Sequence, residues 1–113
     1  EADKHEVLFS LREFKKEKVT EDLIKEVLEA GRWAPSGKNT QPWKFVVVQD
    51  PKTQEELEAI VPQGIIEDAP VTIGILKDRK EGYDRDKDLQ GMGACAQNIM
   101  LAAHGLGLGT CWL

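Results

Sequence analysis

Residues 34–43 read Ala-Pro-Ser-Gly-Lys-Asn-Thr-Gln-Pro-Trp and separate two very different patterns. Before them, apolar residues recur at helical spacing from Leu23 to Leu28; after them, residues 45–48 form a continuous apolar run typical of a buried strand. The stretch itself has a proline near each end, short polar side chains, and Gly37, which permits backbone angles closed to other residues. Such a loop could hold polar groups against a flat polar ring, although an ordinary helix-to-strand turn has the same composition.

The composition is that of a small globular domain. The chain has 113 residues, 41% of them hydrophobic and 31% charged, which is the balance of a folded protein and enough for one domain. A net charge of -5 without a basic run argues against a nucleic-acid partner. No apolar stretch reaches the ~18 residues that a membrane span needs, and no signal peptide is visible, so we expect a cytoplasmic protein with no membrane partner.

The two cysteines indicate neither a disulfide framework nor a metal site. Cys95 and Cys111 lie in apolar surroundings and do not form a CxxC pair. With only His5 and His104 available as further ligands, no zinc site is expected. Two buried, reduced thiols are the simplest interpretation.

The rest of the chain alternates predicted helices and strands. Thr20 is placed to cap a helix, and Thr53 with Glu56 three residues later resembles a capping box. The pattern predicts a short helix within residues 3–9, a helix from 21 to about 33, a strand at 45–48, a helix from 53 to about 61, a strand at 71–76, a helix at 90–104 and a strand-like segment at 110–113. This order predicts an α+β fold or a three-layer α/β/α sandwich.

The predicted helix at 90–104 is apolar or small almost all round. Such a helix is buried on most of its faces, and a partner subunit would be a natural cover for a chain of this size. The glycine-rich residues 105–109 invite a dinucleotide-binding interpretation. They follow a helix instead of opening one, however, so a helix C-cap and turn is favoured.

Three segments, taken in order, resemble the FMN-dependent nitroreductase family. They are residues 34–43 with the strand that follows, residues 96–112 (Ala-Gln-Asn-Ile-Met-Leu-Ala-Ala-His-Gly-Leu-Gly-Leu-Gly-Thr-Cys-Trp), and the weaker match Ser-Leu-Arg-Glu-Phe at 10–14. Together they extend over nearly the whole chain. The resemblance implies a single nitroreductase-like, FMN-binding domain over residues 1–113. The family continues beyond the segment that ends at Leu113, so we expect a domain truncated at its C-terminus.

The resemblance also implies which residues lie at the cofactor. They are Ser10, Arg12, Pro35, Ser36, Gly37, Asn39 and Trp112. Ser10 and Arg12 would face the ribityl phosphate, which suits the forked donors of a guanidinium group. The loop residues would contact the flavin held by the other subunit. One position departs from the family, because Leu8 stands where an arginine is usual.

The function implied is that of an oxidoreductase. In the family, NAD(P)H passes hydride to FMN, and a nitroaromatic, a quinone or a similar flat acceptor is then reduced, in a homodimer with FMN at its interface. We assign no catalytic side chain and no metal ligand, because the cofactor carries the chemistry. Two alternatives stay open: a flavin-binding or flavin-trafficking protein with little turnover, and a structural domain without a cofactor.

Overall fold

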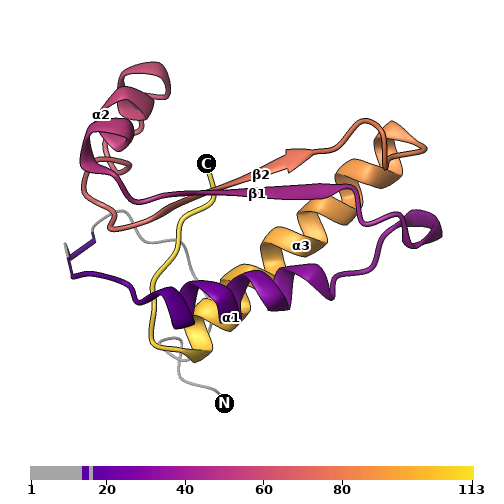
Figure 1. The fold of residues 1–113 in the computed structure, drawn as a ribbon, viewed down its shortest axis with the longest axis horizontal. Coiled ribbons are helices and arrows are strands. Elements are labelled where there is room, and N and C mark those ends of the chain that lie inside the picture. Colours follow the sequence, from indigo (N-terminus) through magenta and orange to yellow (C-terminus); the bar gives the residue numbers. More distant parts are fainter. Residues whose placement is uncertain (1–13, 16) are drawn as a thin grey trace, which may run out of the picture.

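A computed structural model of the protein describes residues 14–15 and 17–113. The elements are, in order, α1 (Glu21–Arg32), the short 3₁₀ helix η2 (Gly37–Asn39), β1 (Trp43–Val48), α2 (Pro51–Ile60), β2 (Thr72–Lys77) and α3 (Arg85–Gly105). Figure 1 shows α1 and α3 running close to the pair of strands, with α2 standing at one end of the sheet. The helix predicted within residues 3–9 lies outside the described residues.

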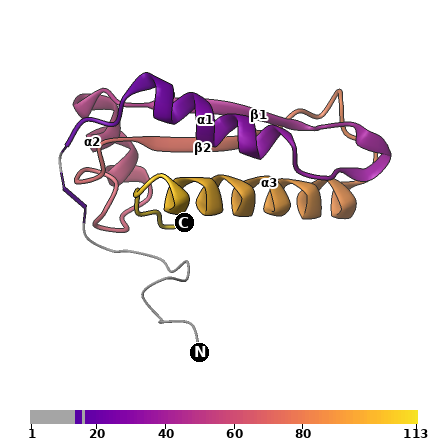
Figure 2. The same cartoon turned by 90° about the horizontal axis from the view of Figure 1, so that it is seen from below.

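The two strands form an antiparallel sheet, in register from Trp43 opposite Lys77 to Val48 opposite Thr72. Both strands were predicted to within two residues at each end. The face carrying Trp43 and Phe45 packs on the helices, while Val46 and Leu76 on the other face are exposed. Figure 2 shows α3 running along the length of this sheet. The α+β class is therefore confirmed, with α1 and α3 packed on one face of the sheet.

The core lies where α1, α3 and this face of the sheet meet. Its buried residues are Val27, Ala34, Trp43, Cys95, Ile99 and Ala103. Gly31 of α1 lets the two helices approach, because a Cβ placed there would lie 2.8 Å from Cγ1 of Ile99 and 3.1 Å from Sγ of Cys95. The absence of a side chain at Gly31 thus allows close packing, which fixes the position of α1 on α3.

Helix α1 begins as predicted, but α2 is capped by a different residue. The Thr20 hydroxyl accepts a hydrogen bond from the Leu23 amide at 3.3 Å. In α2, Asp50 is the N-cap: its Oδ2 accepts from the amide of Thr53 at 3.0 Å and from the Thr53 hydroxyl at 2.7 Å, and these bonds lower the pKa of Asp50. The capping box predicted from Thr53 is wrong, because Pro51 is preorganised for the first helical position and a carboxylate is the stronger acceptor.

Helix α3 begins five residues before the predicted start at Gln90. Asp84 caps it by accepting a hydrogen bond from the Lys87 amide at 3.0 Å. The first turns are mostly polar and exposed, so apolar periodicity did not detect them. None of the described helices, α3 included, combines the length and the apolar composition needed to cross a membrane.

The glycine-rich segment ends α3 as expected. The amide of Leu108 donates to the carbonyl of Ala103 at 2.8 Å, and the amide of Gly107 donates to His104 at 3.0 Å. Gly107 has a φ of 81°, so this is a Schellman motif with glycine at the left-handed position. The strand predicted at 110–113 is not formed; of these residues, only Thr110 makes an isolated bridge, and neither β1 nor β2 pairs with the segment.

Candidate functional site

The loop between α1 and β1 has an unusual backbone. Lys38, Asn39 and Gln41 have φ values of 53°, 55° and 50°, in the region that residues other than glycine rarely adopt. Hydrogen bonds within the loop hold this shape: the Gln41 amide donates to Oγ of Ser36 at 3.0 Å, and Nε2 of Gln41 donates to Oδ1 of Asn39 at 3.2 Å. Each such residue costs roughly 1 kcal/mol or more, and strain of this kind gathers at functional sites.

Gly37 is required here for space and not for its backbone angles. Its φ is not in the left-handed region, so that part of the sequence argument is wrong. A Cβ placed on Gly37 would instead lie 2.5 Å from the hydroxyl oxygen of Tyr83, a residue in the loop before α3. Gly37 therefore lets the Tyr83 side chain lie directly against the loop.

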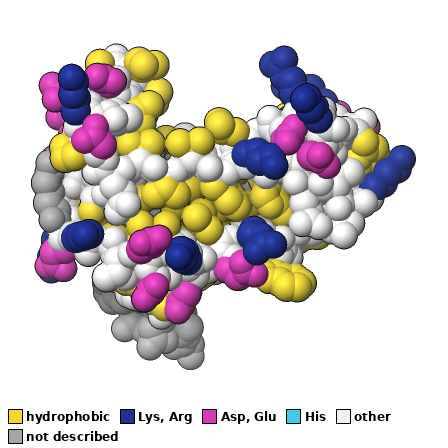
Figure 3. Space-filling model, viewed as in Figure 1, with side chains coloured by type: hydrophobic (Ala, Val, Ile, Leu, Met, Phe, Trp, Pro, Cys, Tyr) yellow, Lys and Arg dark blue, Asp and Glu magenta, His cyan; other side chains and the backbone are white. Residues whose placement is uncertain are grey.

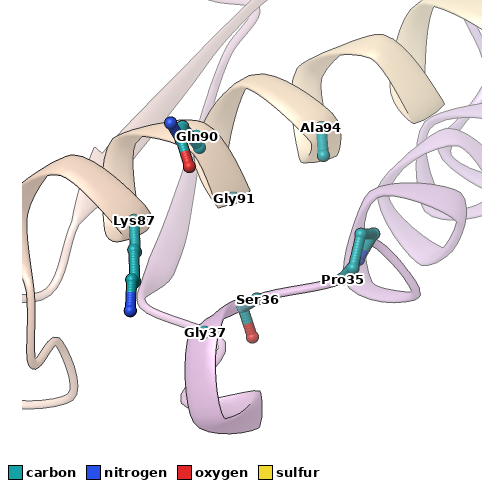
Figure 4. Close-up of a pocket in the computed structure, with 7 residues that line it drawn as sticks. All are labelled: Pro35, Ser36, Gly37, Lys87, Gln90, Gly91 and Ala94. Atoms are coloured by element: carbon teal, nitrogen blue, oxygen red, sulfur yellow. The ribbon is translucent and has the colours of Figure 1, made fainter.

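The loop and α3 line an open pocket of about 330 Å³. Pro35, Ser36 and Gly37 form one wall, and the side of α3 that faces them forms the other (Figure 4). The α3 residues that line the pocket are Lys87, Gln90, Gly91 and Ala94. A Cβ on Gly91 would lie 3.4 Å from the Pro35 carbonyl oxygen, so the absence of a side chain there keeps the pocket open.

Charged groups surround one end of this pocket. Nζ of Lys38 lies 4.6 Å from the centre of the Tyr83 ring, and Nζ of Lys87 lies 5.8 Å from it. Figure 4 shows the Lys87 side chain extending from α3 toward the loop at Gly37. Cations over an aromatic ring are held by its quadrupole. The pocket thus has a cationic rim beside small and polar walls.

A buried ion pair fixes the start of α3 under this rim. Asp88 is only 1% exposed, and its Oδ2 lies 3.5 Å from Nζ of Lys77 at the end of β2. Neither of its carboxylate oxygens accepts a hydrogen bond from any residue that the structure describes. A Cβ on Gly82 would overlap the Asp88 carboxylate, so the loop that carries Tyr83 closes directly over this pair.

The sequence matches the Nitroreductase family over two overlapping ranges, residues 9–64 and 61–113. Together these ranges include every residue that the structure describes. The chain belongs to this family. The nitroreductase resemblance seen in the three sequence segments is therefore confirmed.

Individual nitroreductase-family relatives agree with this assignment. A Methanothermobacter thermautotrophicus protein, whose name combines NADH dehydrogenase and NAD(P)H nitroreductase, is 36% identical over 91% of this chain. Among solved structures, a Desulfovibrio desulfuricans protein with a nitroreductase name, in complex with FMN, is 43% identical over 92% of the chain with a TM-score of 0.88. An FMN-dependent nitroreductase from Clostridium difficile is 30% identical over 96% of the chain with a TM-score of 0.85. The chain spans 54% of the length of the first protein and 62% of each of the two structures.

The nitroreductase site residues expected from the sequence are only partly brought together. Pro35, Ser36 and Gly37 line the pocket, whereas Asn39 is exposed outside its lining. Ser10 and Arg12, and Leu8 in the place of the family arginine, lie outside the described residues.

Trp112 lies on the opposite side of α3 from the loop. A Cβ on Gly93 would lie 3.7 Å from Cη2 of Trp112, whereas the equivalent position on Gly91 faces Pro35 and Ser36. Trp112 instead lines a largely apolar groove of about 860 Å³ formed by α1, β2, α3 and the segments at 65–71 and 107–113. Within one chain, Trp112 and the loop do not share a pocket.

Sequence reasoning missed the α3 wall of the pocket. Lys87, Gln90, Gly91 and Ala94 are spaced i, i+3, i+4 and i+7, which places them on one helix face. That spacing was readable in the sequence once the helix was known to begin before Lys87. Nothing in the sequence alone showed that this face meets the loop.

Proposed function

We propose that this nitroreductase-family chain belongs to an FMN-dependent oxidoreductase, in which NAD(P)H donates hydride and a nitroaromatic, a quinone or a similar flat acceptor is reduced. The open pocket between residues 35–37 and α3 carries the proposal, because Pro35, Ser36 and Gly37, which the sequence assigned to the cofactor, line it. The FMN named for the Desulfovibrio desulfuricans and Clostridium difficile relatives supports it.

The residues around the pocket fit a flat, polar ring system. Gly91 and Ala94 offer a small, smooth wall on α3, and Pro35 forms an apolar surface opposite. A volume of about 330 Å³ is at the low end for a small-molecule site. A Cβ on Gly91 would narrow the cavity from the α3 side, so the glycine there is what such a ring requires.

The polar side chains of Gln90 and Ser36 have different roles in this proposal. Bound FMN would supply the two-electron chemistry, while the protein binds, orients and shields the reacting ring. The Gln90 side chain makes no hydrogen bond to the described residues and can pair with a polar ring edge. The Ser36 hydroxyl is engaged by the Gln41 amide, so it shapes the loop and leaves the backbone to meet the ligand.

A homodimer is the second part of the proposal. The loop and Trp112 lie on opposite sides of α3, so one chain cannot place both against one cofactor. Two copies can, if each contributes its loop to the cofactor that the other holds. The exposed apolar residues of α3 and the segment after it, including Leu101 and Trp112, support such an assembly.

The first experiment is an absorbance spectrum of the purified protein. We expect flavin bands, FMN released on heating, and oxidation of NADPH or NADH when menadione or nitrofurazone is added. Bound FMN without turnover would favour the flavin-binding or flavin-trafficking alternative. Protein that stays colourless and binds no added FMN would exclude the proposal.

A pocket-filling substitution provides the matched variant. We expect Gly91→Val to weaken FMN binding by about tenfold or more, because the larger side chain meets Pro35 and Ser36. Gly105→Ala lies in the last turn of the same helix, where the new Cβ would meet no described atom within 4 Å beyond the adjacent helix backbone, so it should bind FMN as the wild type does. Equal FMN affinity in Gly91→Val, measured by fluorescence quenching, would place the flavin elsewhere.

A further inference from the structure

We propose that Lys38, Tyr83 and Lys87 form a binding site for a phosphate monoester at the rim of the pocket. The two ammonium groups approach one aromatic ring from different elements, Lys38 from η2 and Lys87 from the first turns of α3. The pocket wall at Gly37 lies directly against the hydroxyl of the same tyrosine. Two positive charges thus lie near one aromatic ring beside the pocket proposed for the flavin.

Over the part of the chain that the structure describes, these two charges have no carboxylate partner. Among the described residues, Lys44 pairs with Asp78 and Lys77 with Asp88, but neither Lys38 nor Lys87 has an acidic oxygen within 4.0 Å. In Figure 3, lysine and arginine side chains gather at the end of the molecule where η2 and the loop before α3 lie. Two like charges that share a ring repel each other, so a bound anion would relieve that repulsion.

The surrounding structure holds both lysines in place. Lys38 has a left-handed backbone, with φ at 53°, inside the hydrogen-bonded loop. The amide of Lys87 is bonded to the N-cap Asp84, and the Lys77–Asp88 pair anchors the helix turn beneath it. The site is therefore assembled before any ligand arrives, apart from the ends of the lysine side chains.

The number of charges favours a phosphate monoester over a carboxylate. A monoester carries about -1.5 to -2 charges at pH 7 and three acceptor oxygens. Two lysine ammonium groups match that dianion, whereas a carboxylate would leave one of them unpaired. Lysine is also a common phosphate ligand, acting as a point charge.

Two phosphate monoesters are available in the proposed reaction, so this inference rests on the proposed function for its ligands. One is the 2′-phosphate that distinguishes NADPH from NADH, and the other is the 5′-phosphate that distinguishes FMN from riboflavin. The first would make this site the determinant of NADPH preference. If the ligand is the FMN 5′-phosphate, the two lysines would supply positive charge in place of the family arginine, which is Leu8 in this chain.

The test is calorimetric titration of the flavin-free protein with two pairs of probes. Adenosine 2′-monophosphate and adenosine differ only in the 2′-phosphate, and FMN and riboflavin differ only in the 5′-phosphate. The variants are Lys38→Gln, Lys87→Gln and the double substitution. Lys52→Gln, an exposed lysine in the first turn of α2 without an ion pair among the described residues, is the matched control. Circular dichroism and thermal unfolding verify that each variant is folded.

We expect each substitution to weaken the phosphorylated member of one probe pair by about tenfold, with its unphosphorylated counterpart unchanged. The pair that responds identifies the source of the phosphate. The proposal is overturned if the double variant changes neither pair, if both members of a pair weaken equally, or if Lys52→Gln has the same effect. Failure of the proposed function is seen separately, as the absence of FMN and riboflavin binding by the wild type.

Discussion

At the scale of single residues, Gly31 sets the distance between α1 and α3. An alanine there would place its Cβ 2.8 Å from Cγ1 and 2.9 Å from Cδ1 of Ile99. Overpacking lowers the free energy of unfolding by about 1–3 kcal/mol, whereas replacing a helical glycine with alanine raises it by up to about 1 kcal/mol. We expect Gly31→Ala to lower the free energy of unfolding by about 1 kcal/mol in a urea titration.

Gly105→Ala is the matched control for this prediction, because no atom lies within 4 Å of its new Cβ. It should be neutral or stabilising. If Gly31→Ala were as stable as Gly105→Ala, the two helices would not be packed as closely as described.

Cys95 gives a prediction about pH. It is fully buried, and desolvation raises the pKa of its thiol from 9.0 to about 11. The unfolded chain therefore loses this proton at lower pH than the folded protein. The stability that the protonated thiol contributes is complete below pH 9.0 and falls as the pH rises toward 11. Urea titrations at pH 8 and pH 10.5 should show this loss in the wild type and a smaller one in Cys95→Ala.

Arg12 lies outside the described residues, and its role at the FMN phosphate stays a prediction. Charge-assisted hydrogen bonds contribute roughly 1.5–3 kcal/mol, so Arg12→Ala should weaken FMN by about 10–100-fold. Riboflavin, which has no phosphate, should weaken far less, and Arg12→Lys should recover only part of the loss. Equal weakening of both flavins in a fluorescence titration would mean that Arg12 acts through the fold or the ring.

At the scale of elements, the end of α3 depends on the left-handed backbone of Gly107. With φ at 81°, an alanine there would be strained by about 1–2 kcal/mol, whereas asparagine tolerates this region better. We expect Gly107→Ala to lower the thermal midpoint by several degrees and Gly107→Asn by less. The same midpoint for both variants would contradict the Schellman cap.

The elements that the sequence predicted well are those whose apolar pattern is continuous. Helix α1 and both strands follow from periodicity, because each buries one face or run against the core. The start of α3 was missed, because its first turns are mostly polar and are marked only by the cap at Asp84. The strand expected at 110–113 failed for a different reason: strand propensity does not supply a neighbouring strand.

The candidate site was predictable only as far as the loop composition allowed. Pro35, Ser36 and Gly37 stood out as a rigid polar turn, and they do line the pocket. The opposing residues, such as Gln90, could be found only through the tertiary contact between the loop and α3. The steric role of Gly37 likewise depends on Tyr83, 46 residues further along the chain.

At the scale of the whole molecule, the proposed homodimer can be tested by complementation. Gly91→Val would damage the loop half of the site, and Arg12→Ala would damage the other half. When the two variants are refolded together, half of the dimers should be mixed, each with one intact site, which restores about a quarter of the wild-type FMN capacity. If both halves belonged to one chain, mixing would restore nothing. Light scattering that shows a stable monomer with bound FMN would also exclude the dimer.

Helix α3 has the loop pocket on its Gly91 side and Trp112 on its Gly93 side. In the proposed dimer, each α3 would therefore touch both cofactors, and a small shift toward one would be a shift away from the other. Binding at the two sites should then be thermodynamically linked, with the first molecule of FMN changing the affinity for the second. A titration that follows a single hyperbola, with a Hill coefficient of about 1, would show that α3 stays rigid and that the two sites fill independently.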